Sequence, residues 1–283
     1  MQIERVGVIG AGTMGHGIAQ VTAMAGMKVV LADASEEQLT RALAKVRANL
    51  DKGVERGKVA AEVRDRALSN LSTGTLADAS TAADLVVEAV PEKIDLKQSL
   101  FRQVEAHAPE HAILATNTSS LSVAGIASAV ADPGRVLGMH FFNPVHIMKL
   151  LELIRADGTR PEVVQAAQAF GERIGKQVIV VRDRPGFATS RLGVCLGMEA
   201  IRMLEQGVAS AEDIDAAMVL GYRHPVGPLK LTDMVGLDVR LAIGEYLAAE
   251  LGNPAFKPPQ LMRDMVAAGK LGKKSGEGFY RWG

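Results

Sequence analysis

The chain has 283 residues, a length that favours a core domain of ordinary size together with a smaller second domain. Its 32 lysine and arginine residues equal its 32 aspartate and glutamate residues, so no net charge attracts it to nucleic acid or to an acidic membrane surface. The single cysteine excludes an internal disulfide and a thiolate metal cluster, and no apolar run reaches the roughly 20 residues that a membrane helix needs. We therefore expect a soluble, cytoplasmic protein that acts on a small molecule, with no nucleic-acid or membrane partner.

The first two thirds of the chain predict a doubly wound α/β fold. Apolar runs alternate with helical stretches, and they lie at 5–10, 28–33, 84–90, 112–116 and 135–141, with extensions of the sheet at 150–154 and 177–181. Continuous apolar runs of this kind are typical of parallel strands that are buried on both faces. The strand signals stop after about residue 183. We expect a Rossmann-type parallel-sheet domain at 1–183, with a helical insertion at 36–68, and an all-helical domain at 184–283.

A glycine motif stands at the turn from the first predicted strand to the first helix. Gly10, Gly12 and Gly15 form GxGxxG, and Asp33 follows 23 positions after the first glycine, at the end of the next strand. The glycines allow a tight turn, close approach of a pyrophosphate and close packing of helix on strand. The acidic residue accepts hydrogen bonds from an adenosine ribose and repels a 2′-phosphate, so the motif favours NAD over NADP.

Two polar residues in apolar surroundings are candidates for the chemistry. His140 lies in GMHFFNPV, and Glu152, twelve positions later, is the only acidic residue of KLLELI. A carboxylate beside an imidazole orients the ring and stabilises its protonated form, which is what a general base requires. The alternative is a hydrogen-bonded core histidine with a glutamate that points out of an edge strand. The remaining histidines are not spaced for a metal site, so no metal is expected.

Four motifs together give the chain a family resemblance. GAGTMG at 10–15, NTSSL at 117–121, HFFNP at 140–144 and GKKSGEGFY at 272–280 resemble the L-3-hydroxyacyl-CoA dehydrogenase family, including 3-hydroxybutyryl-CoA dehydrogenases, along essentially the whole chain. The resemblance implies a catalytic set of Ser119, His140, Glu152 and the residue at 190. The implied NAD contacts are Gly10, Ala11, Gly12, Thr13, Met14, Gly15, Asp33, Glu92, Lys97, Asn117, Ser119, Asn143 and Lys274. The implied coenzyme A contacts are Asn49 and Arg56 of the insertion, with Ser119 at the substrate's oxygen.

One position departs from the family pattern. The family usually has asparagine where PGFATSR places Ser190, and a serine offers one hydroxyl in place of an amide's separate donor and acceptor. This change leaves the base in place but alters the surroundings of the substrate. The charged residues of the insertion also allow two readings, a solvated helix face or contacts with the phosphates of coenzyme A.

The leading hypothesis is an NAD-dependent 3-hydroxyacyl-CoA dehydrogenase of fatty acid metabolism and β-oxidation, acting on a short chain such as 3-hydroxybutyryl-CoA. Two alternatives remain: a dehydrogenase of a free hydroxy acid, as in the related gulonate dehydrogenases, and a noncatalytic NAD-binding protein. The resemblance also implies a homodimer through the helical domain, which would close the active site as well.

Overall fold

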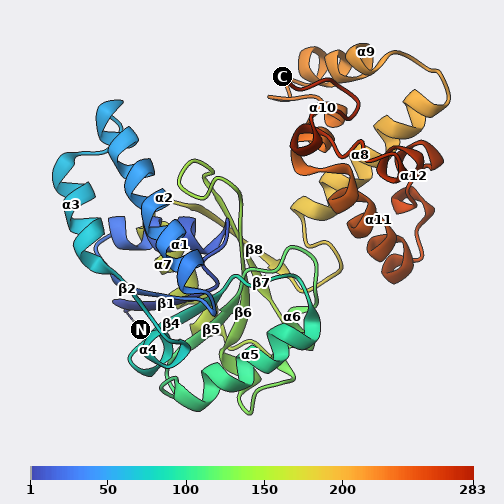
Figure 1. Cartoon of the computed structure of the whole chain (residues 1–283). Coiled ribbons are helices and arrows are strands. Elements are labelled where there is room, and N and C mark those ends of the chain that lie inside the picture. Colours follow the sequence, from blue (N-terminus) through green and yellow to red (C-terminus); the bar gives the residue numbers. More distant parts are fainter. Residues whose placement is uncertain (1) are drawn as a thin grey trace. The chain divides into compact units, whose positions relative to one another are not determined.

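The computed structural model describes residues 2–283, and its contacts divide the chain into two compact units, one that ends at Arg184 and one from Pro185 to Gly283. The first unit is a sheet flanked by helices, and the second is helical (Figure 1). None of the helices in residues 2–283 is both long enough and apolar enough to cross a membrane.

Eight strands form one sheet in the order β3-β2-β1-β4-β5-β6-β7-β8. Their bounds are β1 Arg5–Ile9, β2 Lys28–Ala32, β3 Leu71–Gly74, β4 Leu85–Glu88, β5 Ile113–Thr116, β6 Val136–Phe141, β7 Leu150–Arg155 and β8 Gln177–Arg182. Neighbours from β3 to β6 are parallel, β6 and β7 are antiparallel, and β7 and β8 are parallel. The strand order reverses between β1 and β4, and the crevice at the carboxyl ends of two such strands is where doubly wound folds bind ligands.

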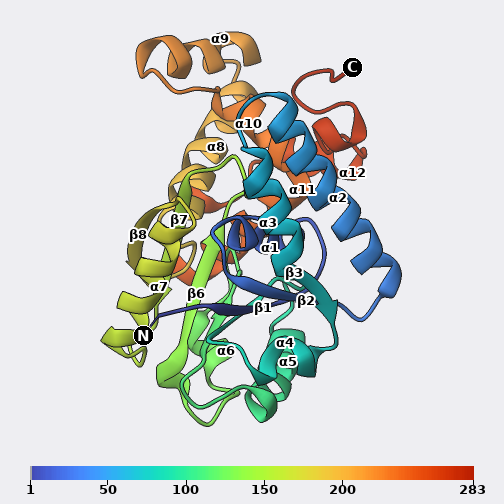
Figure 2. The same ribbon diagram turned by 90° about the vertical axis from the view of Figure 1, so that its left-hand side faces the viewer.

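Helices cover both faces of this sheet (Figures 1 and 2). Their bounds are α1 Gly15–Met24, α2 Glu36–Glu55, α3 Ala61–Asn70, α4 Leu76–Thr81, α5 Ile94–His107, α6 Val123–Ala127 and α7 Pro161–Arg173. The apolar sides of α1, α2 and α7 share one core with the strands, whereas α4, α5 and α6 lie on the other face. The sheet is therefore buried on both sides, which explains its continuous apolar strands.

The insertion after β2 is an amphipathic helix pair. Ser35 caps α2 by accepting a hydrogen bond from the Gln38 amide, and the buried residues Ala42, Val46 and Leu50 recur every four positions along one side. That side packs against α1, so the polar residues of α2 remain on its outer face or face the glycine-rich loop. The insertion is thus attached firmly at the edge of the sheet where the glycine motif lies.

The second unit has its own apolar core. Its helices are α8 Thr189–Glu205, α9 Ala211–Ala216, α10 Pro228–Val235, α11 Leu237–Leu251 and α12 Gln260–Ala267, with a π-helical turn at Ala217–Gly221. Met198, Ile201 and Leu247 lie at the centre of the core and are almost fully buried. Asp233 is 1% exposed and accepts hydrogen bonds of 2.9 Å from the amides of Phe279 and Tyr280, which holds the C-terminal segment against α10.

The doubly wound α/β fold with a second, helical unit is confirmed, but the sheet differs from the expectation in two respects. Strand β3 was not predicted, because LSTG has only one apolar residue and none of its side chains is buried. A parallel sheet was expected, whereas β7 and β8 run against the other six strands. Residues 142–149 contain no helix and are fewer than the roughly dozen that a parallel crossover needs, so an antiparallel pair is the only connection they allow.

Candidate active site and coenzyme cavity

The glycine-rich loop between β1 and α1 depends on glycine at two positions. Gly10 has a φ of +99°, and a Cβ there would lie 2.7 Å from the carbonyl oxygen of Ala89. A Cβ on Gly15 would lie 1.6 Å from the Gly10 carbonyl oxygen, so α1 can start here only without a side chain. A Cβ on Gly12 would have no atom within 4 Å. The loop therefore leaves open space for a phosphate beside the start of α1.

Asp33, directly after β2, holds the loop in place. Its Oδ2 accepts a 2.7 Å hydrogen bond from the Ala11 amide, and its Oδ1 accepts one of 2.9 Å from the Ser35 amide. The first bond ties the glycine-rich loop to the end of β2, and the second shapes the turn into α2. Each carboxylate oxygen keeps lone-pair capacity for a further donor, such as a ribose hydroxyl.

A cavity of about 920 Å³ opens beside this loop. It is lined by the carboxyl ends of β1, β2 and β4 and by residues of α5, among them Gly10, Asp33, Val90, Leu96 and Leu100. Apolar walls with a carboxylate at one end suit an adenine ring and its ribose, and the glycine-rich loop suits the phosphates that follow. The residues present therefore fit a dinucleotide.

His140 and Glu152 face each other across the antiparallel strands β6 and β7. They are directly paired in the register, and His140 Nδ1 lies 2.8 Å from Glu152 Oε2. His140 is 8% exposed and Glu152 is completely buried. The Phe142 ring lies against the imidazole at a centroid distance of 4.4 Å. A buried carboxylate at this distance fixes the orientation and tautomer of the ring and stabilises its protonated form.

The loop that carries Ser119 is organised by Glu92. Glu92 Oε1 accepts hydrogen bonds from the Thr118 hydroxyl at 2.5 Å, the Ser119 amide at 2.8 Å and the Ser120 amide at 3.2 Å. The Ser119 hydroxyl lies 3.3 Å from the same oxygen. Burial raises the pKa of Glu92, but the positive charge of Lys97 and these hydrogen bonds outweigh it and leave the pKa below its ordinary value. Glu92 is therefore ionised at neutral pH and acts as a fixed acceptor for the loop.

Lys97 and Glu88 form a buried pair, and Glu88 was not among the predicted site residues. The Lys97 ammonium donates 2.7 Å to Glu88 Oε1 and lies 3.3 Å from Glu92 Oε2, and Lys97 has no exposed surface. Glu88 also accepts hydrogen bonds from the Thr116 hydroxyl and the Val90 amide, both at 2.7 Å. Lys97 contacts the Ser119 loop through Glu92, and its direct contact with NAD stays a prediction. The sequence signal for Glu88 was an acidic residue in the otherwise apolar strand LVVE, and the same kind of signal identified Glu152.

Two asparagines stand near the ends of β5 and β6. Asn117 Oδ1 accepts a 2.9 Å hydrogen bond from the Phe141 amide, which joins the NTSSL and HFFNP motifs. Asn143 lies just after β6 and is exposed. Asn117 thus links the segment that carries Ser119 to the end of β6, the strand of His140, at the carboxyl edge of the sheet.

The insertion residues assigned to coenzyme A differ in their settings. Asn49 is half-buried, and its Nδ2 donates 3.2 Å to Oε1 of Gln20 in α1. Arg56 caps the C-terminal end of α2 and is exposed. Both lie on the insertion, and their contact with coenzyme A stays a prediction.

Ser190 and Lys274 belong to the second unit. Ser190 lies in the first turn of α8, directly after the turn of Gly186 and Phe187, which both have positive φ. The Lys274 ammonium lies 2.6 Å from the carboxylate of Asp238 at the start of α11. Within residues 2–283 no group of three or more metal-ligating side chains could hold a metal ion.

A dinucleotide cavity with an acidic residue after β2, together with a carboxylate-oriented imidazole at the same edge of the sheet, defines an NAD-dependent oxidoreductase. The family profile described as 3-hydroxyacyl-CoA dehydrogenase, NAD binding domain, matches residues 5–184, and the C-terminal domain of the same family matches residues 186–282. The chain therefore belongs to the 3-hydroxyacyl-CoA dehydrogenase family.

Named relatives agree with this assignment. The chain is 42% identical over 282 residues to a 3-hydroxybutyryl-CoA dehydrogenase of Mycobacterium tuberculosis, with 99% of each chain covered. It is 42% identical over 283 residues to a 3-hydroxyadipyl-CoA dehydrogenase of Escherichia coli, covering 100% of this chain and 60% of the relative. The crystal structure of an (S)-3-hydroxybutyryl-CoA dehydrogenase from Ralstonia eutropha is similar with a TM-score of 0.96, at 41% identity and full coverage of both chains.

Proposed function

We propose that this enzyme oxidises short-chain (S)-3-hydroxyacyl-CoA thioesters to 3-oxoacyl-CoA, with 3-hydroxybutyryl-CoA as the preferred substrate. The 2.8 Å contact between His140 and buried Glu152 carries the proposal, because oxidation of a secondary alcohol needs a base for the hydroxyl proton. The short chain is supported by the names of the relatives in Mycobacterium tuberculosis and Ralstonia eutropha.

His140 is the general base in this proposal. Because Nδ1 holds its hydrogen against Glu152, Nε2 is the atom that takes the proton of the substrate's C3 hydroxyl. Glu152 stabilises the imidazolium that results, and in the reverse direction the imidazolium returns the proton. The glycine-rich loop and Asp33 would hold NAD, which when bound would supply the hydride acceptor for C3.

Ser119 binds the substrate's oxygen in this proposal. Its hydroxyl donates to the C3 oxygen as negative charge develops there, and the loop amides held by Glu92 keep it in place. Ser190 takes the position at which the family usually has asparagine, and its assignment to the substrate follows from the family resemblance, with one hydroxyl in place of an amide.

The coenzyme contacts are also proposed. The glycine-rich loop holds the pyrophosphate, Asp33 accepts hydrogen bonds from the adenosine ribose, and Asn143 lies at the nicotinamide end. Glu92 after β4, Asn117 after β5 and Lys97 of α5 support this end. Lys274 is assigned to the coenzyme by family resemblance alone.

A substrate series tests the proposal. NADH formation is followed with (S)-3-hydroxyacyl-CoA substrates of increasing chain length, with 3-hydroxyadipyl-CoA and with the free 3-hydroxy acids. We expect the highest kcat/KM for the four-carbon thioester. A preference for the dicarboxylate or for long chains would contradict the short-chain assignment, and turnover of free acids alone would favour a hydroxy acid dehydrogenase. NADH binding without turnover of any of them would indicate a noncatalytic protein.

We also propose that the protein is a homodimer through its helical unit. Several large apolar side chains of this unit are exposed, namely Leu192, Val208, Leu220, Tyr222, Met234, Val235 and Val239. Exposed apolar surface of this extent supports an interface between two copies. Sedimentation should give twice the monomer mass, and the variant Leu220→Glu, at the most exposed of these side chains, should shift the equilibrium towards monomer.

The proposed location is the cytoplasm, and the proposed role is short-chain acyl-CoA oxidation. Cys195, the only cysteine, lies half-buried in α8, and a free thiol there fits a reducing compartment.

A further inference from the structure

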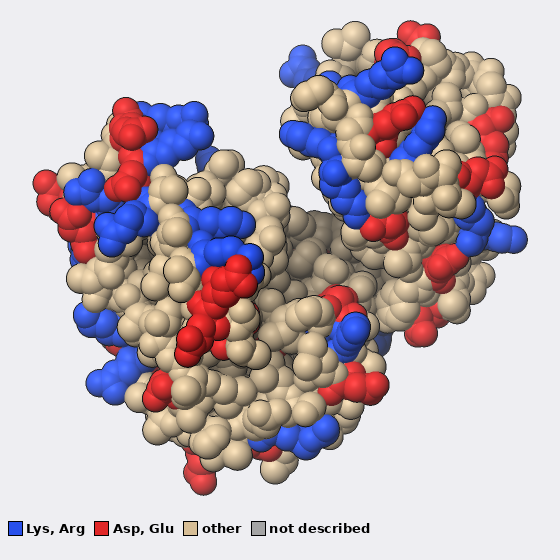
Figure 3. All heavy atoms as spheres, in the orientation of Figure 1, with Lys and Arg blue, Asp and Glu red and all other residues tan. Residues whose placement is uncertain are grey.

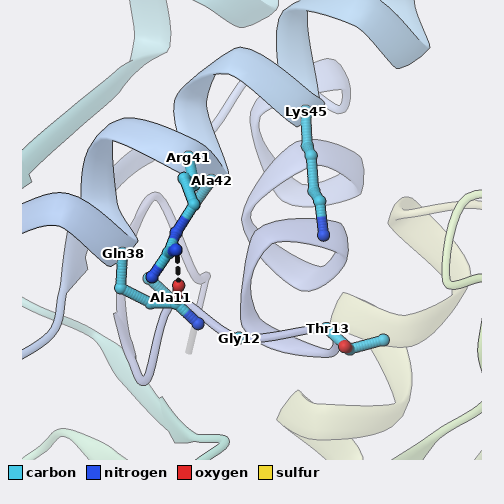
Figure 4. A pocket seen from close by; sticks show the side chains of 7 residues that line it. All are labelled: Ala11, Gly12, Thr13, Gln38, Arg41, Ala42 and Lys45. Carbon is cyan, nitrogen blue, oxygen red and sulfur yellow. Dashed lines mark hydrogen bonds between the residues drawn. The ribbon is translucent and has the colours of Figure 1, made fainter.

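We infer that Arg41 and Lys45 of α2 bind the pyrophosphate of NAD from the side of the insertion. A second pocket, of about 350 Å³, lies between α2 and the glycine-rich loop, and both cations line it together with Gly12 and Thr13 (Figure 4). The inference rests on the proposed placement of NAD in the larger cavity.

The pocket continues the coenzyme cavity. Gly12, Thr13, Gln38 and Arg41 line both spaces. A dinucleotide whose ribose lies at Asp33 and whose phosphates lie at Gly12 would therefore pass along the mouth of this pocket. On this path the phosphates, rather than the adenine, would pass the pocket that Arg41 and Lys45 line.

The face of α2 that points to the loop is determined by helical spacing. Arg41 and Ala42 lie three and four positions after Gln38, and Lys45 lies four and three positions after them, so all four share one side of the helix. Ala42 is 1% exposed, and its small side chain lets the helix lie close to the loop. Figure 4 shows the Arg41 and Lys45 side chains extending from the helix towards the loop of Ala11, Gly12 and Thr13.

The charged residues that line the pocket are both cations. No aspartate or glutamate lines it. Arg41 Nε donates 3.1 Å to Gln38 Oε1, which orients the guanidinium, and Arg41 Nη1 lies 3.0 Å from Glu37, whose side chain is 76% exposed. A surface pair of this kind is worth little and exchanges readily for a phosphate. Lys45 forms no ion pair with any residue in 2–283.

The start of α1 adds to this positive field. It has no acidic residue in its first turn, and no side chain caps its first amides. Uncapped amides at a helix start and two cations across a pocket are complementary to a group with two negative charges, which is the charge of a pyrophosphate. The diphosphate of coenzyme A has the same chemistry, but the shared lining with the Asp33 cavity favours NAD.

The test compares ligands that differ in phosphate content. Dissociation constants of NADH, ADP and adenosine are measured for the wild type and for Arg41→Gln, Lys45→Gln and the double variant. Lys58→Gln is the matched control, since Lys58 is an exposed cation of the same insertion that lines neither space. We expect each single variant to weaken NADH and ADP about threefold to fivefold, the double variant about tenfold or more, and adenosine not at all. The salt dependence of NADH binding should also decrease in the double variant.

Three results would overturn the inference. One is unchanged NADH and ADP binding in the double variant. Another is an equal loss for adenosine, which would indicate a role at the adenine or in the fold. The third is a higher KM for acyl-CoA with unchanged NADH binding, which would assign the pocket to the diphosphate of the substrate. These dissociation constants are measured without turnover. They can therefore be interpreted even if the proposed substrate assignment fails.

Discussion

The ammonium of Lys97 lies 2.7 Å from Glu88 Oε1, and neither side chain has more than 1% of its surface exposed. Two charges at this depth are stable only as a pair, because each alone would be costly to remove from water. The pair stands between β4 and α5, next to the carboxylate that organises the Ser119 loop. Lys97 therefore influences the site through Glu92.

Lys97→Met should destabilise the protein by about 3 to 5 kcal/mol, because it leaves the Glu88 carboxylate buried without a counter-charge. Chemical denaturation measures this loss. The double variant Lys97→Met with Glu88→Gln should recover part of it, and Lys93→Met, an exposed lysine four residues earlier, should be near neutral. Normal stability with weaker NADH binding would instead support direct contact between Lys97 and the coenzyme.

Glu92→Gln should reduce stability at neutral pH but not in acid. The folded-state pKa of Glu92 lies below its ordinary value of 4.5, so its ionised form stabilises the fold above that pH, and the contribution is lost as the pH falls through the folded-state pKa. The difference in unfolding free energy between wild type and variant should therefore shrink as the pH is lowered from 7 towards 3. A difference that stays constant over this range would show that the charge of Glu92 is irrelevant.

His140→Gln should lower kcat by about 10² to 10⁴, the usual contribution of a general base. NADH binding should stay close to that of the wild type, because the coenzyme cavity does not include His140. Steady-state turnover and a NADH titration separate the two effects. Near-normal turnover would rule out His140 as the base.

Glu152→Gln should keep a hydrogen bond to His140 but lose the charge that stabilises the imidazolium, so we expect a deep loss of turnover. The fold should tolerate the change, since the amide has nearly the same shape as the carboxylate. The pH–rate profile of alcohol oxidation is the informative measurement. On its acid side the base becomes protonated and can no longer take the hydroxyl proton, so this limb should shift when the base loses its partner. An unchanged rate and profile would make Glu152 a structural residue.

Arg56→Ala should raise the KM for an acyl-CoA and spare the corresponding pantetheine thioester, which lacks the nucleotide phosphates. Arg56 is exposed at the end of α2, where a ligand can reach it from solvent. Because the side chain is not part of the core, the variant should fold normally. The ratio of the two KM values is the quantity to compare between wild type and variant. Equal changes for both thioesters would refute a phosphate contact.

The sequence predicted the parts of the fold that depend on local pattern. The strand-glycine-helix signature located β1 and α1, and the apolar runs located seven of the eight strands, because buried strands need apolar residues along their length. It could not predict strand direction from periodicity, since a parallel and an antiparallel strand bury the same residues. β3 was not predicted, because Ser72 and Thr73 are exposed at the edge of the sheet and give no apolar run.

The candidate site was predictable where a polar residue interrupts an apolar strand or a motif is family-specific. His140 and Glu152 were found in this way, and the structure places them in contact. Glu88 shows the same signal but its partner Lys97 comes from a helix, and nothing in the spacing of a helix and a strand reveals which side chains meet in the interior. Arg41 and Lys45 look in sequence like any charged helix face, and only the closeness of α2 to the glycine-rich loop distinguishes them.

The direct register pairing of His140 with Glu152 makes catalysis a reporter of correct folding. A slip of one residue between β6 and β7 would turn Glu152 to the opposite face and set Leu151 or Leu153 against the imidazole. Such a misregistered chain would keep most of its helices and its coenzyme cavity, so its circular dichroism and NADH binding would look native. During refolding, recovery of turnover that lags behind recovery of NADH binding would therefore measure how long this one strand pair takes to find its alignment.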